Sequence, residues 1–184
     1  MRKKTDDTNA ENRFPPRINI LGFDCAGKTL SAGLLTESGF YAAEANGGQK
    51  HSELIMDMAD YLLKTAGITP KELSAAACMQ GPGSFTGLRI GFSAAKGLSL
   101  SLGIPFISIP TLDCMACSYS FFPGLVIPLI DAKKNCYFTA LYRGGKAIGP
   151  YLDAGPDEIA SLVAENRAPG EGVLLTGPDA ESAL

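Results

Sequence analysis

The sequence has no tryptophan, a single histidine and no excess of basic side chains. Its 184 residues carry 16 Lys and Arg against 19 Asp and Glu, which gives a formal net charge of −3. A protein that grips nucleic acid alone usually presents a basic face, so any RNA is expected to be held by a partner. The lone His51 also weakens a serine-hydrolase interpretation, because Ser84 would need it as its base.

Membrane segments, signal sequences and paired cysteine motifs are also lacking. No apolar run is long enough to cross a membrane, and the basic N-terminus has no apolar stretch of the signal-peptide kind. The five cysteines are odd in number, which is typical of reduced thiols. Cys114 and Cys117 form one CxxC pair without a second pair or a nearby histidine, so the pattern favours core cysteines over zinc ligands. We expect a cytoplasmic protein without a metal site.

The most informative stretch is the glycine-rich segment 80–91, which reads QGPGSFTGLRIG. Glycine reaches backbone angles that other residues avoid, so four glycines this close indicate an unusual backbone path. The pattern predicts a strand, a tight turn and a helix N-terminus capped by Ser84 or Thr86. Such a helix start is a potential anion site, and the alternative is a compact strand-to-helix connector.

A similar order of elements occurs twice along the chain. Hydrophobic patterning predicts strands at 18–24, 29–35, 39–45, 73–79 and 104–109, with helices at 51–66, 86–102 and about 110–120. The second pattern has a strand at 125–130, a strand at 135–143, a helix at 157–165 and a strand at 173–177. The repetition suggests duplicated lobes, at 18–120 and, in incomplete form, at 121–184. Residues 1–17 are polar and charged and are interpreted as a disordered leader.

The helices predicted at 51–66 and 86–102 each have a distinctive face. The first carries an apolar stripe at four-residue spacing, formed by Leu54, Met58 and Leu62. The second carries a row of mostly small side chains, formed by Ile90, Ala94, Gly97 and Ser101. We expect Leu88, Phe92, Ala95 and Leu102 to face the core. A smooth row allows close approach of another helix or close packing on the protein's own sheet, and both interpretations remain open.

Four stretches of the sequence together resemble the TsaB (YeaZ) family. They are ILGFD at 20–24 with SAGL at 31–34, KHSE at 50–53, residues 80–109, and IPLIDAKK at 127–134 with Tyr137. The segment 80–109 is the closest match, and the resemblance covers about residues 18–142, well beyond a short motif.

The resemblance implies an α/β fold of the actin-like ATPase (ASKHA, ribonuclease H-like) type, with two lobes built on mixed sheets. The second lobe of this sequence is short or incomplete, which departs from the family. It also implies a non-catalytic scaffold in the synthesis of N6-threonylcarbamoyladenosine on tRNA. Its partner would be the TsaD transferase, with TsaC as the upstream enzyme, TsaE as an associated ATPase, and tRNA held only through the complex.

The resemblance further implies where the partner docks. In the family, the helices matching 51–66 and 86–102 meet the same helices of TsaD, so the stripe and the small-residue row defined above would form the interface. A homodimer of the chain alone remains open. TsaD binds its metal through two histidines four residues apart, whereas here Ile55 stands four residues after His51. We therefore expect no catalytic residues and no metal, and interpret His51 as a helix-start residue.

One departure from the family pattern raises a different function. Residues 22–29, GFDCAGKT, match the P-loop pattern GxxxxGK[ST]. In a P-loop NTPase, the Gly27-Lys28-Thr29 segment would bind phosphate and magnesium, and a helix would have to follow. Gly33 and the break at 37–39 leave such a helix under three turns.

A second alternative is an active ATP-binding kinase of the actin-like fold. Asp24 and Asp131 lie at the ends of equivalent strands, where such enzymes place acids around magnesium. The competing interpretation is that both acids cap tight turns. A residual nucleotide site would involve Asp24, Asp131 and the glycines Gly81, Gly83 and Gly87. No other cofactor is expected, and weak ATP or ADP binding at the interface of the complex remains open.

Overall fold

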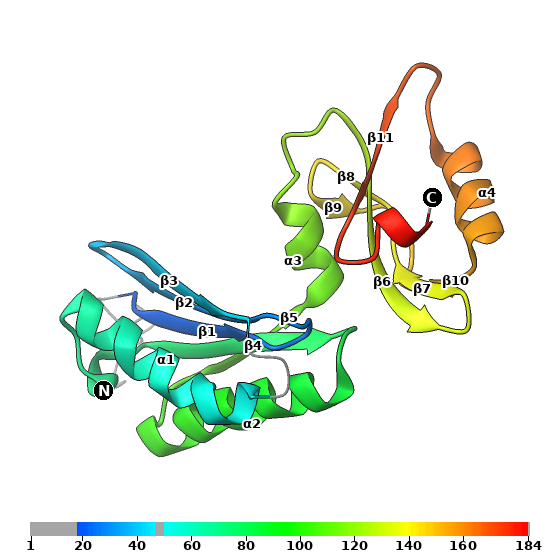
Figure 1. Cartoon of the computed structure of the whole chain (residues 1–184). Helices are drawn as coiled ribbons and strands as arrows, with labels where there is room; N and C mark the ends of the chain where they lie inside the picture. Colours follow the sequence, from blue (N-terminus) through cyan, green and yellow to red (C-terminus); the bar gives the residue numbers. More distant parts are fainter. Residues whose placement is uncertain (1–17, 47–49, 184) are drawn as a thin grey trace, which may run out of the picture.

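Two mixed β-sheets, one from each half of the chain, organise the structure (Figure 1). The computed structural model describes residues 18–46 and 50–183. The predicted leader at 1–17 lies outside these residues. Within the described part of the chain, no helix has the length and apolar character that crossing a membrane requires.

The first sheet has the strand order β3-β2-β1-β4-β5. Its strands are β1 (Ile20–Asp24), β2 (Leu30–Thr36), β3 (Gly39–Ala45), β4 (Ala75–Gly81) and β5 (Phe106–Pro110). The first three pair antiparallel, whereas β4 and β5 run parallel to β1. The predicted mixed sheet is therefore confirmed, strand for strand.

Two helices, α1 (His51–Ala66) and α2 (Phe85–Leu102), cover one face of this sheet (Figure 1). Alternation along β1 and β2 points Leu21, Leu30 and Leu34 into the core beneath the helices. Helix α1 contributes its apolar face to the same core and ends at Gly67, whose positive φ of 69° suits glycine. The core of the first half therefore lies between the sheet and these two helices.

The face of α2 that meets the sheet agrees with the prediction at Ala95 and Leu102, which pack in or against the core, and differs from it at Phe92. Its buried side chains are small and recur every four residues, namely Gly87, Gly91, Ala95 and Ser99. Phe92, expected in the core, is 38% exposed, and its ring lies edge-on to Phe106 with centroids 4.8 Å apart. The physical reason is the closeness of the helix to the sheet, since a Cβ at Gly87 would lie 2.0 Å from the carbonyl oxygen of Cys25.

The second sheet repeats the strand arrangement of the first. Its strands are β6 (Gly124–Lys133), β7 (Cys136–Thr139), β8 (Tyr142–Arg143), β9 (Lys146–Ala147), β10 (Leu152–Ala154) and β11 (Gly172–Thr176). Both β7 and β8 pair antiparallel with β6 in one register, so the strand predicted at 135–143 is one path with a short break. The order β10-β7-β6-β11 matches β3-β2-β1-β4, with β11 parallel to β6. Helix α4 (Pro156–Asn166) takes the place of α1 in the sequence of elements.

A short helix, α3 (Thr111–Cys117), joins the two halves. Leu112 and Ala116 pack in the second core against β6 and β8. The carboxylate of Asp113 accepts hydrogen bonds from the hydroxyls of Tyr142 (2.6 Å) and Tyr151 (2.7 Å). The lobe boundary at 120/121 remains a prediction, and α3 packs with the second half. Single 3₁₀ turns at Pro70–Glu72 (η1) and Glu181–Ala183 (η2) complete the described elements.

The close contact of α2 with the first sheet gives a stability prediction. Gly87→Ala should destabilise the fold by about 1–3 kcal/mol, because the added methyl overlaps the Cys25 carbonyl. Gly97→Ala is the matched control in the same helix, since its Cβ would meet nothing within 4 Å. It should stabilise the protein by up to about 1 kcal/mol, because alanine is the better helix former. Urea unfolding of the two variants measures the difference, and equal effects of the two substitutions would contradict the packing described.

Candidate functional site

The glycine loop after β4 folds back onto the turn between β1 and β2. The Gly81–Pro82 peptide is cis, and Gly81 and Gly83 have φ values of 110° and 153°. The backbone N–H of Ser84 donates to the carbonyl of Ala26 (2.7 Å). The Ser84 hydroxyl accepts from the N–H of Gly87 (3.2 Å) and so caps α2. The predicted cap is confirmed, with Ser84 rather than Thr86 in the role.

The protein's own atoms occupy the space beside the loop glycines. A Cβ at Gly83 would lie 2.6 Å from the Ala26 carbonyl oxygen, and one at Gly81 would lie 3.2 Å from the Leu88 side chain. Together with the contact of Gly87 on Cys25, these distances explain each glycine by packing within the chain. The connector interpretation therefore accounts for the loop, and a nucleotide role for its glycines remains a prediction.

Asp24 and Asp131 cap equivalent turns in the two halves of the chain. The Asp24 carboxylate accepts from the N–H of Ala26 (2.8 Å), and the Asp131 carboxylate accepts from the N–H of Lys133 (2.7 Å). Asp131 also pairs with the Lys133 ammonium at 2.6 Å. The interpretation of both acids as turn caps is confirmed, and a further role toward magnesium or nucleotide is untested.

The P-loop interpretation is wrong. Residues 25–29 lead from β1 directly into antiparallel β2, with Asp24 opposite Ser31. A P-loop must open a helix whose free amides face the phosphates, and here a strand follows. Lys28 is exposed on the turn, and the Thr29 hydroxyl donates to the side-chain oxygen of Asn46 at 3.2 Å.

His51 is a structural residue at the start of α1. Its side chain is 5% exposed, and Nε2 lies 3.1 Å from the carbonyl oxygen of Lys28. Because a carbonyl only accepts, Nε2 carries the proton in this hydrogen bond. The imidazole thus ties α1 to the β1–β2 turn. The described residues contain no cluster of His, Cys, Asp and Glu suited to a metal ion.

Burial disfavours charge around the β1–β2 turn. It raises the pKa of the Cys25 thiol to about 12, with the nearby Asp24 carboxylate adding to the effect. Burial also raises the pKa of Cys78 to about 11 and that of Asp24 above its ordinary range. Both thiols are therefore protonated at neutral pH, which makes them poor nucleophiles. The prediction of core cysteines concerned Cys114 and Cys117, and it is wrong for Cys117, which is exposed at the end of α3, whereas Cys114 is half-buried.

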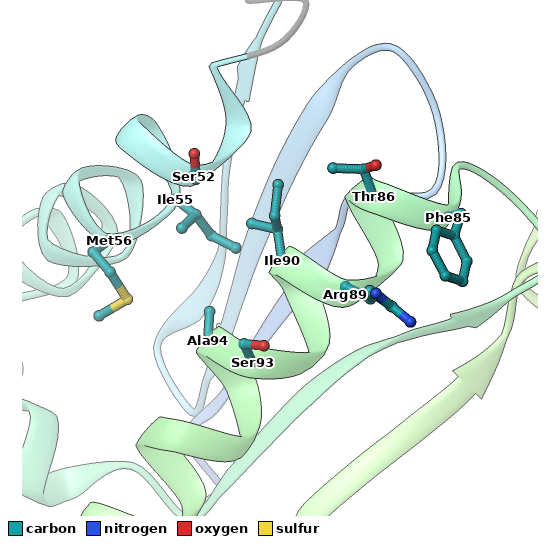
Figure 2. A pocket seen from close by; sticks show the side chains of 9 residues that line it. All are labelled: Ser52, Ile55, Met56, Phe85, Thr86, Arg89, Ile90, Ser93 and Ala94. Atoms are coloured by element: carbon teal, nitrogen blue, oxygen red, sulfur yellow. The ribbon is translucent and has the colours of Figure 1, made fainter.

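An open groove of about 460 Å³ lies between α1 and α2. It is lined by Ser52, Ile55 and Met56 from α1 and by Phe85, Thr86, Arg89, Ile90, Ser93 and Ala94 from α2. Figure 2 shows Ile55 and Ile90 facing each other across it, with Phe85 and Arg89 on the side of α2 away from α1. The groove lies on the side of both helices that faces away from the sheet.

The predicted interface residues divide between the core and this surface. Met58 and Leu62 are 9% and 1% exposed and hold α1 on the sheet, so neither reaches a partner in this conformation. Leu54 is half-buried against the same core. Ile90 and Ala94 line the groove and also pack against the core, and Gly97 and Ser101 are exposed further along α2.

Sequence reasoning missed the large exposed apolar side chains of the two helices. Met56 and Tyr61 are 47% and 60% exposed on α1, and Phe85 and Leu100 are 69% and 75% exposed on α2. A signal was present on α1, because Met56 and Tyr61 are apolar residues outside the four-residue stripe. A helix that is apolar beyond its core-facing stripe presents a second surface.

Comparison with known proteins identifies the family. A family model described as TsaD, tRNA N6-adenosine threonylcarbamoyltransferase, matches residues 42–170. The TsaB protein of Bacillus subtilis, a tRNA threonylcarbamoyladenosine biosynthesis protein, is 35% identical over 127 residues, which make up 68% of this chain and 56% of that protein. The chain belongs to the TsaB family. It spans about half the length of the curated TsaB relatives that it matches.

Two further comparisons concern a related transferase and the fold. The tRNA N6-adenosine threonylcarbamoyltransferase of Nitratidesulfovibrio vulgaris is 31% identical over 122 residues, covering 64% of this chain and 34% of that protein. The structure of YeaZ from Pseudomonas aeruginosa aligns with a TM-score of 0.73 at 21% identity, covering 91% of this chain and 90% of that one. With the repeated mixed sheets, it confirms the predicted two-lobed, actin-like α/β fold of the TsaB family.

The raised pKa of Asp24 gives a pH-dependent prediction. A carboxyl whose folded pKa exceeds its unfolded value stabilises the fold most below the unfolded value, and this contribution is lost as pH rises through the folded pKa. Asp24→Asn keeps the acceptor for the Ala26 N–H and removes the charge. Its unfolding free energy relative to wild type should therefore rise between about pH 4 and about pH 7.

Urea unfolding at the two pH values tests this expectation. Asp153→Asn, at an exposed carboxylate on β10, is the control for the removal of one negative charge. A relative stability of Asp24→Asn that falls with pH would show that the charged form of Asp24 is the favoured one.

The β1–β2 hairpin also predicts that Lys28 has no nucleotide-binding role. Titration calorimetry with ATP and magnesium should give the same isotherm for wild type and Lys28→Ala, because no helix N-terminus stands behind the lysine. Lys134→Ala, on the equivalent β6–β7 turn, is the matched control. Wild-type binding that is lost only in Lys28→Ala would restore the phosphate-binding interpretation.

Proposed function

We propose that this TsaB-family chain is the non-catalytic scaffold subunit of the machinery that makes N6-threonylcarbamoyladenosine on tRNA. In this proposal it pairs through α1 and α2 with the TsaD transferase. One structural observation supports this proposal in addition to family membership. Both helices present exposed apolar side chains beside a groove that opens away from the core.

The surface has the character of a protein interface. Met56, Tyr61, Phe85 and Leu100 are all between 47% and 75% exposed, and Met56 and Phe85 line the groove. Exposed apolar side chains that gather on one surface of a soluble protein commonly mark a docking site. A Cβ at Gly97 would meet nothing within 4 Å, so nothing in the chain requires a glycine there for packing. Small residues at such positions let a partner helix approach closely.

The transferase is the favoured occupant because it is related to this chain. The TsaD family model matches residues 42–170, which include α1 and α2, and the Nitratidesulfovibrio vulgaris transferase is 31% identical over 122 residues. A paralogue with the same two helices can meet them about a pseudo-two-fold axis, as in isologous dimers. A second copy of the chain is the alternative occupant when TsaD is absent.

The chemistry in this proposal belongs to the partners. His51, the chain's single histidine, is used in a buried hydrogen bond to the Lys28 carbonyl, so the transfer site lies on TsaD. TsaC supplies the threonylcarbamoyl donor, TsaE joins the assembly, and tRNA is held through the complex. The net charge of −3 supports this indirect contact with RNA, and the proposed location is the cytoplasm.

Gly97→Leu tests the docking surface. The substitution places a branched side chain on the open face of α2 and should weaken pairing with TsaD by about 10-fold or more, because the partner helix can no longer approach closely. The fold should survive, since the site is free of neighbours. Co-purification with TsaD of the same source, followed by a titration of the two purified proteins, gives the measurement.

Gly149→Leu is the matched control in the second half of the chain, where a Cβ also meets nothing within 4 Å. It should pair as the wild type does. Pairing of Gly97→Leu at wild-type affinity would remove this part of α2 from the interface, and a wild-type chain that fails to bind TsaD would reject the proposed function.

A further inference from the structure

The only charged side chains of α2 are two cations, and each stacks on an aromatic ring of the same helix. The Arg89 guanidinium carbon lies 3.9 Å from the centroid of the Phe85 ring, and the Lys96 ammonium lies 5.9 Å from that of Phe92. These four residues form a line along one exposed side of α2, which we name the aromatic–cation stripe. All four are exposed.

Helix α1, on the other side of the groove, carries mainly charges of the opposite sign, although none of them lines the groove itself. Glu53, Asp57 and Asp60 are exposed on α1, and the single cation of that helix, Lys64, is paired with Asp60. The apolar floor of the groove, at Ile55 and Ile90, therefore separates an acidic helix from a basic one. A partner that covers both helices has to match this polarity.

We propose that Arg89, held on Phe85, is a carboxylate-recognition element of this docking surface, and that the protein partner presents an Asp or Glu side chain to it. The inference rests on the proposed function, because it names the chemistry of the partner at the same groove. The occupant is the related transferase, with an acidic side chain on the helix that meets α2.

The geometry of Arg89 suits this role. Within the described part of the chain Arg89 makes no ion pair, and its contact with the Phe85 ring restrains the guanidinium without using its N–H donors. A planar guanidinium offers paired donors that match the two oxygens of a carboxylate. Arg89 is among the residues that line the groove, and its side chain lies on the side of α2 away from α1 (Figure 2). A partner that covers α2 would exclude water from the pair and strengthen it.

Charge reversal at Arg89 gives the test. Affinity of the full chain for TsaD of the same source is measured by titration at several salt concentrations. Arg89→Glu should weaken binding by about 10-fold or more, as expected for an arginine anchor, and should reduce the dependence of affinity on salt. Arg89→Lys keeps the charge but loses the planar fork, so it should bind with intermediate affinity.

Controls separate this effect from misfolding and from net charge. Arg89 is exposed on α2 and makes no ion pair within the described residues, so the thermal melt of Arg89→Glu should match that of wild type. Lys146→Glu makes the same change in net charge on exposed β9 in the second half, and it should bind TsaD as wild type does. Replacing the partner's matching acid by Lys should restore the affinity of Arg89→Glu.

The outcomes distinguish the inference from the proposed function. Wild-type affinity and salt dependence of Arg89→Glu, together with lost pairing of Gly97→Leu, would overturn the carboxylate element and leave the docking surface standing. A change in self-association without a change in TsaD binding would assign Arg89 to a second copy and overturn the inference. Binding that responds to Arg89 only when ATP is present would assign it to a phosphate, with the same consequence.

Discussion

The close contact between α2 and the β1–β2 turn is the constraint on which the first half of the structure depends. A Cβ at Gly83 or Gly87 would lie within 2.6 Å of a carbonyl oxygen of that turn, and one at Gly91 would lie 3.3 Å from the Cys25 sulfur. These short distances place the helix low on the sheet. Small residues therefore fill its inner face, and large side chains such as Phe85 and Leu100 remain outside. The exposed groove and the exposed apolar side chains of α2 follow from this depth of packing.

The second half has a comparable glycine contact, so the resemblance between the halves goes beyond the order of the strands. Gly177-Pro178 follows β11 as Gly81-Pro82 follows β4. Gly177 has a φ of 100°, and its Cβ would lie 2.6 Å from the carbonyl oxygen of Leu129 on β6. In the first half the corresponding close contact is made by Gly83, two residues after β4, against the Ala26 carbonyl oxygen of the β1–β2 turn, whereas a Cβ at Gly81 would meet only the Leu88 side chain. Asp179 then accepts a hydrogen bond from the N–H of Asp131 (2.8 Å), which ties this turn to the end of β6.

Most of the strands and helices were predictable, because periodicity and turn residues mark them directly. The orientation of α2 was predictable only in part: Ala95 lies in the core as expected, but Phe92 does not. The helix carries two small-residue rows, one fully buried around Gly91 and Ala95 and one less buried around Ala94 and Gly97. Hydrophobicity alone favours Phe92 for the core. Only the short distance between α2 and Cys25 shows that the buried face of the helix needs a glycine. The apolar stripe of α1 was placed outward for a related reason. Met58 and Leu62 fit a core and an interface equally well in sequence, and burial assigns them to the core.

Charge gives the surface a means of choosing among partners that apolar packing lacks. Two related proteins with the same helix pair offer similar shapes, so shape alone discriminates weakly between a second copy and a paralogue. In a symmetric pair in which α2 meets its own copy, Arg89 and Lys96 of both subunits would face one another, and like charges brought together out of water oppose association. A paralogue with an acid at the facing position turns this repulsion into attraction. The cations of α2 therefore disfavour self-pairing through that helix while they favour a partner of complementary charge.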